Sequence, residues 1–312
     1  MDLRQLRYFL AIVESRSITR AADILCIAQP ALSLAVKNLE EELGTQLLIR
    51  SVQGVKATPA GELLYRHAMG IVRQADNTKA LLSQQGQQPG GKVAVGMPYS
   101  TAHLIAIDIV DRLRTDYPGI SLDLVESSSA DLQMLVLHGR VDLAIVVGEP
   151  LRGLVQTQLL NEQLFAVRHP RLASPAPVCS LAELATLPLV LVSQPNIVRT
   201  KLDQAFAAAR LGYQLVASVN ATSLLVSWVE RGVGATVLPW SAVHEQVQTG
   251  KLIATPLEGD FWQRDLWLCH AETMPLTPAA EIVQSLIVQE VTRRVGSGEW
   301  VGARSTLAER EA

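Results

Sequence analysis

Residues 17–43 read SITRAADILCIAQPALSLAVKNLEEEL, and the spacing of apolar residues in this stretch predicts two short helices joined by a tight turn. Ala21 and Ala22 place small side chains on one face of the first helix, which lets a second helix cross it closely. Gln29 and Pro30 open the second helix, because proline is tolerated in a first turn where its missing N–H would have no partner. The stretch therefore predicts a helix-turn-helix.

The second helix of this pair separates an apolar stripe from a polar face. Apolar residues at steps of four, three and four predict the buried stripe, which consists of Leu32, Val36, Leu39 and Leu43. The same spacing turns four polar residues outward, namely Gln29, Ser33, Lys37 and Asn38. A short helix with polar groups on its free face can enter the major groove of DNA.

Two flanking segments complete a small domain around this helix pair. Residues 6–13 carry apolar side chains at helical spacing and predict a first helix that covers the pair. Residues 46–50 and 55–58 predict two short strands around Gln53 and Gly54, a sequence typical of a tight hairpin. A hairpin beside a helix-turn-helix forms a wing, and the alternative is an ordinary surface loop.

A long helix is predicted after the hairpin, with Thr58 as its N-cap and Pro59 at its first position. It extends to about Gln85, before the sequence GQQPGGK at residues 86–92. Residues at steps of four and three form the seam of a short coiled coil, namely Leu64, Ala68, Ile71, Ala75, Thr78 and Leu82. We expect this helix to pair with a second copy, and the alternative is an amphipathic helix packed on its own domain.

From Lys92 onward, strands rich in β-branched residues alternate with helices, a pattern typical of parallel α/β folds. The strands are predicted at residues 93–97, 120–126, 141–148, 164–170, 187–193, 214–219, 234–239 and 266–271. This is too many for one small unit, so we expect two α/β subdomains with crossovers near residues 159–163 and 260–266. Ligands of such folds bind at strand C-termini, in the crevice between the halves.

Length and charge limit what the chain can do. A length of 312 residues predicts two or three domains. The net charge of -3 gives no general attraction to nucleic acid, and the first sixty residues hold seven Lys and Arg against six Asp and Glu. DNA binding by this chain must therefore depend on a few well-placed cations.

Missing motifs argue against several other classes of protein. Cys26, Cys179 and Cys269 lie far apart without a C-x-x-C spacing, which argues against a zinc site or disulfides and predicts reduced, mostly packed thiols. The chain has no H-E-x-x-H, G-x-S-x-G or Walker A sequence, which argues against an enzyme. Because no signal-peptide or membrane-span pattern is found, we expect a cytoplasmic protein without a membrane partner.

Over its first 295 residues the chain resembles the LysR-type transcriptional regulators. The residues that carry the resemblance are Phe9, Leu10, Val13, Ser17, Thr19, Arg20, Ala21, Ala22, Leu25, Gln29, Pro30, Ala31, Leu32, Ser33, Leu39, Glu40, Leu43, Gly44, Leu47, Leu48, Arg50, Gly54, Val55, Thr58, Ala60 and Gly61. The phrases IAQPALS and QLLIR are similar to the nitrogen-assimilation-control branch of this family.

The resemblance implies an α/β protein with an N-terminal winged helix-turn-helix, a long linker helix and a C-terminal domain like the periplasmic binding proteins. The expected ranges are 1–58 for DNA binding, 59–90 for the linker, dimerisation helix and hinge, and 91–295 for effector sensing. Subdomain I of the sensing domain would cover about 91–160 and 266–295, and subdomain II about 161–265. We expect the polar tail at 296–312 to fray.

By position in the family's motif, Gln29, Pro30 and Ser33 are expected to approach base edges. The residues expected to hold phosphates are Thr19, Arg20, Lys37, Arg50 and Lys56, although the two on the hairpin could be ordinary solvated charges. The chain departs from the family pattern at Ala28, where a capping Ser or Thr is common, and at Leu34 and Ala35. Gln53 stands where the wing often has Arg, which predicts weaker minor-groove insertion and a weaker dependence of DNA binding on salt.

Polar residues follow the predicted strands of the sensing domain, where a small organic anion would bind between the subdomains. The candidates are Ser100, Thr101, Ser128, Asn196, Arg199 and Thr222, with Arg199 expected to pair with a carboxylate. The alternative is that the hydroxyl groups only cap helices.

The resemblance further implies promoter DNA, RNA polymerase and other copies of the chain as partners, in a homodimer that assembles into a homotetramer. We expect no cofactor or metal. The competing hypothesis is a small-molecule binding protein, with a carboxylate ligand and an N-terminal interaction module.

Overall fold

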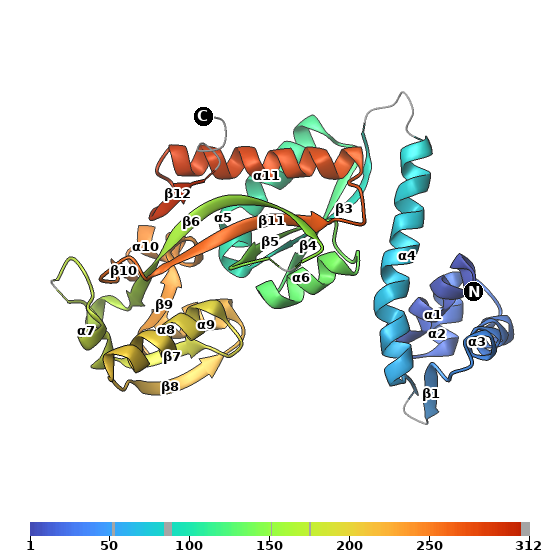
Figure 1. Ribbon diagram of the computed structural model, residues 1–312, viewed down its shortest axis with the longest axis horizontal. Helices are drawn as coiled ribbons and strands as arrows, with labels where there is room; N and C mark the ends of the chain where they lie inside the picture. The colour runs from blue at the N-terminus through green and yellow to red at the C-terminus, as the bar shows by residue number, and fades with distance from the viewer. Residues whose placement is uncertain (52–53, 84–88, 151, 175, 307–312) are drawn as a thin grey trace. The chain divides into compact units, whose positions relative to one another are not determined.

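The computed structural model describes residues 1–51, 54–83, 89–150, 152–174 and 176–306, shown in Figure 1. The chain divides into two compact units. Unit 1 comprises Met1–Gln87 with Leu137–Arg140, and unit 2 comprises Gln88–Val136 with Val141–Ala312.

Unit 1 contains the predicted helix-turn-helix. Its first three helices are α1 (Leu3–Ser15), α2 (Ile18–Leu25) and α3 (Gln29–Leu43), and they share one core. The stripe of α3 is buried as predicted except at Leu43, which is exposed because the last turn of the helix extends beyond this core. No single described helix has the length and apolar composition to cross a membrane. Helices α2 and α3 pass that test only as a pair, which is bent by 109°.

The predicted wing is a two-stranded antiparallel hairpin of β1 (Leu48–Ser51) and β2 (Gly54–Ala57). Gly54 has a φ of +120°, and a Cβ added there would lie 2.7 Å from the carbonyl oxygen of Arg16. The same carbonyl accepts a hydrogen bond of 3.0 Å from the backbone N–H of Val55. Only glycine therefore lets the hairpin approach the turn between α1 and α2 this closely.

The long helix α4 covers Pro59–Ser83, and the Thr58 hydroxyl accepts a hydrogen bond from the backbone N–H of Gly61, as expected of an N-cap. The first half of the predicted seam is used within unit 1, since Ala68 is buried against Leu6 and Leu10 of α1 and Leu64 packs beside it. The expectation that these two residues face a second copy is wrong for that reason. Ile71, in contrast, is exposed, and the side chain of Leu82 lies outside the described part.

Unit 2 contains a sheet with the strand order β10-β6-β11-β5-β3-β4, and β9 and β12 also pair with β6. Strand β3 pairs in parallel with β4 and β5, but β6 and β11 are antiparallel to their neighbours, so the expected parallel arrangement holds only in part. The strands are β3 (Gly91–Met97), β4 (Ile120–Glu126), β5 (Leu143–Val147), β6 (Leu154–Arg168), β9 (Thr236–Pro239), β10 (Ile253–Pro256), β11 (Gln263–Ala271) and β12 (Ala303–Ser305).

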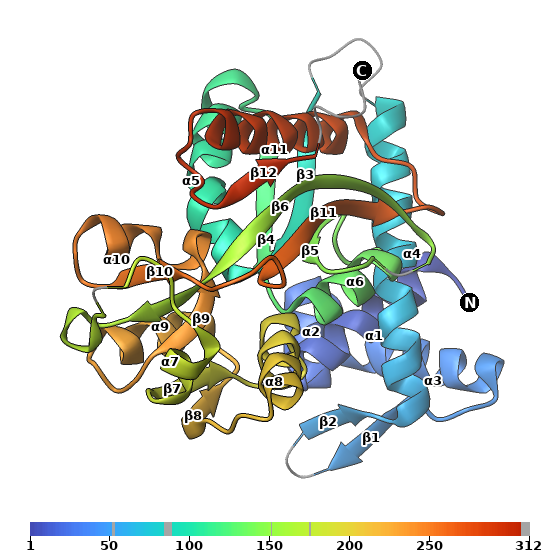
Figure 2. The same cartoon turned by 60° about the vertical axis from the view of Figure 1, so that its left-hand side comes forward.

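Two long strands join the two halves of unit 2, as Figure 2 shows. The first part of β6 pairs with β11, whereas its last residues pair with β9 and β10. The sequence predicts crossovers in these regions, near residues 159–163 and 260–266. It did not predict that β6 begins as early as Leu154.

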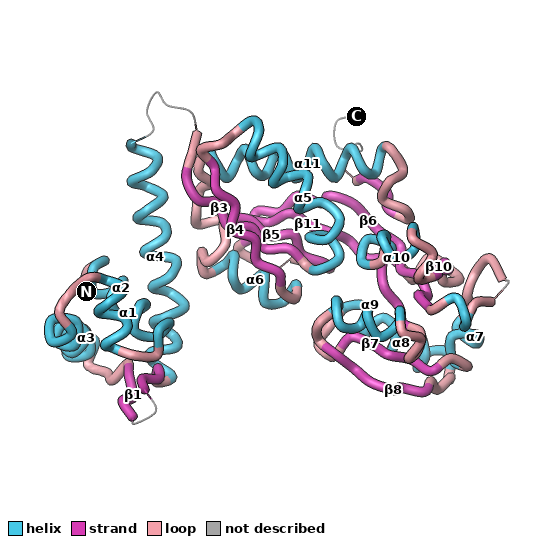
Figure 3. Tube along the Cα trace, turned by 180° about the vertical axis from the view of Figure 1, so that it is seen from behind, coloured by secondary structure: helices cyan, strands magenta, loops and turns pink. Residues whose placement is uncertain are grey.

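Helices cover the strands of both halves, as the tube in Figure 3 shows. In the first half, α5 packs on α11, which also contacts β3. In the second half, the parallel strands β7 and β8 are covered by α8 and α9. The remaining elements of unit 2 are α5 (Tyr99–Asp116), α6 (Ser129–Leu137), η1 (Pro170–Leu172), α7 (Leu181–Ala185), β7 (Pro188–Val192), α8 (Ile197–Ala209), β8 (Gln214–Val219), α9 (Thr222–Glu230), η2 (Trp240–Ala242), α10 (His244–Gln248) and α11 (Pro278–Gly296).

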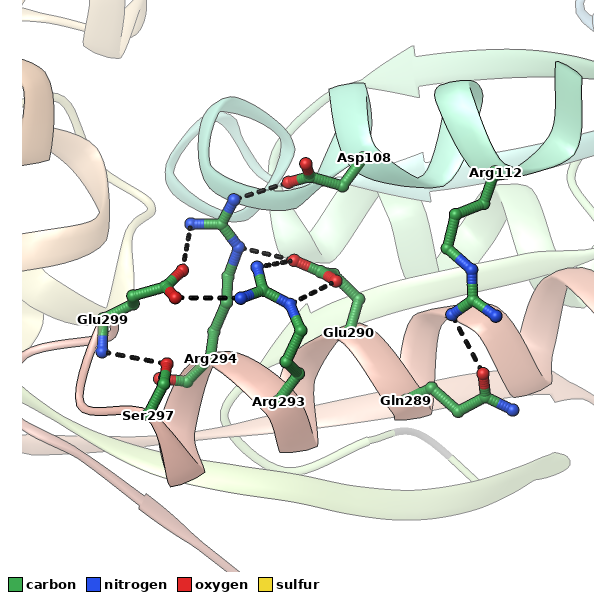
Figure 4. A network of polar contacts seen from close by, with 8 residues as sticks. All are labelled: Asp108, Arg112, Gln289, Glu290, Arg293, Arg294, Ser297 and Glu299. Carbon is green, nitrogen blue, oxygen red and sulfur yellow. Dashed lines mark hydrogen bonds and ion pairs between the residues drawn. The ribbon is translucent and has the colours of Figure 1, made fainter. Parts of the chain in front are cut away.

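The segment after α11 is ordered by tertiary contacts, so the expectation of a fraying tail is wrong for residues 297–305. Figure 4 shows that Arg293 and Arg294 both form ion pairs with Glu299 and with Glu290. Arg294 also forms an ion pair with Asp108 of α5. Farther along, Trp300 is only 1% exposed and β12 pairs with β6. Although the segment is mostly polar, it contains one large apolar side chain that is buried and one strand that pairs with the sheet.

Candidate nucleic-acid interface and ligand cleft

The N-terminus of α3 presents the expected polar face of unit 1. Gln29 and Pro30 are exposed, and the Gln29 amide donates a hydrogen bond of 2.9 Å to the hydroxyl of the half-buried Ser33. Ala28 is the N-cap and makes no side-chain hydrogen bond to the helix. The first N–H groups of α3 therefore have no side-chain cap, and this end of the helix favours a negative group such as a phosphate.

The five residues expected to hold phosphates are all exposed on unit 1. Thr19 and Arg20 lie in the first turn of α2, whose N-cap is Ser17. Arg50 and Lys56 lie on the two strands of the wing and have no ion-pair partner among the described residues. The ammonium of Lys37 lies 3.4 Å from the carboxylate of Glu41, an exposed pair that is weak enough to open when a phosphate approaches. Gln53 lies outside the described residues.

Leu34 is an exposed apolar residue on the same helix, and the sequence-based interpretation did not include it in the interface. Its side chain is 57% exposed, one turn after Pro30. An aliphatic group on a groove-reading helix can contact the methyl group of thymine. One feature of the sequence could have identified Leu34: it is an apolar residue between Ser33 and Lys37, which are both predicted to face outward.

Unit 2 contains a cleft of about 740 Å³ between its two halves. The lining segments follow the C-terminal ends of four strands, β3, β4, β7 and β8, and they meet Arg264 of β11. Four helices, α5, α6, α8 and α9, begin in these same segments. The cleft is thus surrounded by helix N-termini from both halves, as expected where parallel strands end.

Four of the six expected effector residues line this cleft, namely Ser100, Ser128, Asn196 and Thr222. Thr101 does not, because it is fully buried on the core side of α5. Arg199 does not either, because its guanidinium lies 3.0 Å from the carboxylate of Asp203, one turn along α8. The expectation that these two residues face a ligand is therefore wrong.

Asp203 forms an ion pair with Arg199 and thereby keeps this cation from binding a ligand. Burial raises the pKa of the Asp203 carboxyl, but hydrogen bonds from Tyr213, Arg199 and Gln194 outweigh burial and leave that pKa below its ordinary value. Asp203 is therefore ionised at neutral pH and holds Arg199 in place. The contact also orders Gln194, which lines the cleft.

Two of the predicted residues cap helices, which the alternative interpretation expected of hydroxyl groups such as that of Ser128 but not of Asn196. The Ser128 hydroxyl donates a hydrogen bond of 2.7 Å to Asp131 and accepts one of 3.2 Å from the backbone N–H of Asp131, in the first turn of α6. Asn196 is the N-cap of α8 and accepts from the N–H groups of Val198 and Arg199. Helices α5 and α9 have Pro98 and Ala221 at this position and no side-chain cap.

Arg264 was missed from the sequence because the predicted strand began only at residue 266. It is 8% exposed, yet it lines the cleft. Its Nε donates a hydrogen bond of 2.8 Å to the Glu162 carboxylate. Its Nη2 donates one hydrogen bond to the same carboxylate and one of 2.8 Å to the Ser100 hydroxyl. Arg264 thereby connects the floor of the cleft to the two long strands, where it lies opposite Glu162 in the β6–β11 register.

Glu162 is the buried partner that compensates this charge. Its side chain is 1% exposed and also accepts hydrogen bonds of 2.9 Å from the Ser241 hydroxyl and from the Trp300 indole. Both carboxylate oxygens are therefore satisfied, as a buried ion pair requires. The floor of the cleft depends on β6, β11, η2 and the C-terminal segment together.

Family models match both units of the chain. The model described as bacterial regulatory helix-turn-helix protein, lysR family, matches residues 3–62, and the LysR substrate binding domain matches residues 86–291. The chain belongs to the LysR family. This LysR chain is therefore a DNA-binding transcriptional regulator with an effector-binding domain and not an enzyme, as the sequence predicted.

Relatives of this LysR chain match it along almost its whole length. The nitrogen assimilation regulatory protein nac of Escherichia coli (strain K12) is 35% identical over 297 residues, which is 95% of this chain and 97% of that protein. A full-length OxyR variant from Pseudomonas aeruginosa has a TM-score of 0.71 at 21% identity, over 94% of this chain and 95% of that chain. CbnR complexed with its target DNA has a TM-score of 0.68 at 18% sequence identity, over 94% of this chain and 99% of that chain.

Proposed function

We propose that this regulator binds promoter DNA through residues 1–58, pairs through 59–90, and binds a small organic anion within 91–295. Subdomain I covers about 91–160 and 266–295, and subdomain II about 161–265. The single observation that carries the DNA-binding part is the exposed Gln29–Ser33 face at an N-terminus of α3 that lacks a side-chain cap. A regulator needs such a face, whereas a pure small-molecule binding protein does not.

On DNA, the Gln29 amide is suited to adenine N6 and N7, and Leu34 to a thymine methyl group. The cations Arg20, Arg50 and Lys56 would fix the register on phosphates, which carry no sequence information. A dimer places two such helices on half-sites about one helical turn apart. CbnR, a protein with the same fold, is known in complex with its target DNA, which supports DNA binding as the role of this fold.

The pairing surface that we propose is the exposed side of α4. Leu63 and Ile71 are both exposed apolar residues, two helical turns apart on the same face. Burying such a stripe against a second copy removes apolar area from water. We propose a homodimer formed in this way, its assembly into a homotetramer, and contact with RNA polymerase at the promoter.

The experiment is a titration of the full chain with DNA from its own promoter region, followed by fluorescence anisotropy. Gln29→Ala should lower the affinity for the specific site by about tenfold or more, since one bidentate base contact contributes about 1 to 3 kcal/mol. Lys56→Ala should weaken specific and random DNA alike and reduce the salt dependence of binding. Gln248→Ala, an exposed change on α10 of unit 2, is the matched control.

Two outcomes decide against the proposal. If the chain binds no promoter fragment at low salt while its cleft still binds a ligand, the competing small-molecule binding function is favoured. If Gln29→Ala lowers the affinity for random DNA as much as for the specific site, Gln29 does not read bases.

A further inference from the structure

The four helix N-termini around the cleft are of two kinds. Helices α6 and α8 are capped by their own Ser128 and Asn196, and the α6 end also carries the carboxylate of Asp131. Helices α5 and α9 have no side-chain cap. A ligand anion would therefore be attracted to α5 and α9, whose first N–H groups have no intrahelical acceptor.

Arg264 marks the same place independently. It is more than nine-tenths buried, and its Nη1 has no hydrogen-bond partner among residues 89–150, 152–174 and 176–306. Its Nη2 binds the hydroxyl of Ser100, the second residue of α5. A carboxylate at the N-terminus of α5 can thus also accept from Nη1, and charge-assisted bonds of this kind are the strong ones.

The rest of the lining is acidic rather than basic. Glu126 and Asp131 line the cleft from the ends of β4 and the first turn of α6. Neither carboxylate has a Lys or Arg partner in the part of the chain that the structure describes, and Asp131 accepts only from Ser127 and Ser128. The one cation of the lining, Arg264, is already compensated by Glu162.

We propose that the ligand of this cleft is a zwitterion, an amine-bearing carboxylate of the amino-acid class. Its carboxylate lies at α5, α9 and Arg264, and its ammonium group lies toward Glu126 and Asp131. This inference rests on the proposed function and specifies the ligand further. A simple dicarboxylate would place its second charge against the carboxylates of Glu126 and Asp131, and like charges repel.

The placement also explains how a ligand would join the two halves. Helix α5 belongs to one half and α9 to the other, and the two helices are in contact. A carboxylate bound by both N-termini stabilises the closed arrangement, because it interacts less well when one helix moves away. The ammonium group then selects which carboxylates can do so.

The experiment uses the full chain without DNA and two panels, the twenty common L-amino acids and their 2-hydroxy acids, measured by thermal shift and calorimetry. We expect at least one amino acid to bind and its 2-hydroxy acid to bind at least about tenfold more weakly, the loss of one charge-assisted contact. If 2-hydroxy acids bind as well as or better than amino acids, the zwitterion is wrong and the organic anion of the proposed function stands. If neither panel binds, the zwitterion is wrong, whereas the organic anion of the proposed function fails only if carboxylates outside both panels do not bind either.

A variant pair tests the position of the ammonium group. Glu126→Gln keeps the shape of an exposed side chain, so it should weaken amino-acid binding by about tenfold and leave the 2-hydroxy acid unchanged or slightly tighter. Glu272→Gln, an exposed acid of unit 2 outside the cleft lining, should change neither affinity. Equal losses for both ligands in Glu126→Gln would show that Glu126 shapes the cleft only, and would overturn the proposal.

Discussion

The polar face of α3 and the floor of the ligand cleft both consist of hydrogen-bonding side chains, but they are held very differently. Gln29 is exposed and bonds only Ser33 of its own helix. Glu162 is buried and bonds Arg264, Ser241 and Trp300, from three segments far apart in the chain. The face is available for a partner, whereas the floor is already part of the fold.

This difference predicts opposite consequences for similar changes. A polar residue that binds only outside partners can be replaced with little effect on folding, because water satisfies whatever it leaves. A buried charge cannot, because its partner is left without compensation. Function and stability should therefore separate cleanly in unit 1 and be coupled in unit 2.

The largest effect is expected at the floor. Glu162→Leu should lower the free energy of unfolding of unit 2 by about 3 to 5 kcal/mol, since the Arg264 charge stays buried without its partner. Urea denaturation followed by circular dichroism measures this change. The double variant Glu162→Leu with Arg264→Met should recover much of the loss, because it removes both charges. A double variant as unstable as the single one would contradict this account.

A smaller loss is expected at Trp300, the contact from the C-terminal segment. Trp300→Phe keeps most of the buried ring but removes the hydrogen bond to Glu162, which should cost about 1.5 to 3 kcal/mol. Comparison with Val301→Ala, an exposed neighbour, controls for changes in the segment itself. Stability equal to that of the parent chain would mean that this segment does not support the floor.

A second ion pair of unit 2, between the buried Arg168 and the half-buried Glu183, should make its stability depend on pH. A hydrogen bond from the buried Arg168 holds the pKa of Glu183 below its ordinary value of 4.5. Because the folded-state pKa is the lower one, the contribution of the pair is complete above about pH 4.5 and is lost as the pH falls through the folded-state value. Denaturation curves between pH 7 and pH 3 should show a steeper loss for the parent chain than for Glu183→Gln.

The smallest effect on stability is expected on the DNA-facing surface. Gln29→Ala should change the free energy of unfolding by no more than about 0.5 kcal/mol, while promoter binding falls as described above. Thermal unfolding beside the DNA titration makes the comparison within one sample. A large loss of stability would show that the bond between Gln29 and Ser33 is structural, and would remove the contrast with Glu162.

The accuracy of the sequence-based predictions follows the same division. The spacing of apolar residues and the capping residues correctly predicted the helix-turn-helix, the wing and the N-cap of α4 at Thr58. These features depend on residues that are neighbours in the sequence. Arg199 was misjudged because its partner, Asp203, is an equally local acid that the interpretation did not consider. Ala68 was assigned to a seam because spacing alone cannot say which of two surfaces a small residue faces.

By itself, the sequence determined the helix-turn-helix, the wing, most strands of unit 2, the family and the polar residues that follow the strands, since all of these are encoded in local spacing and turn residues. Only the tertiary structure decided that Arg264 lies in the cleft, that Glu162 compensates it and that Trp300 completes the floor. The physical reason is desolvation. A charge can be buried only where several groups, distant in the sequence, pair with it and hydrogen-bond to it, and no local sequence pattern shows which groups these are.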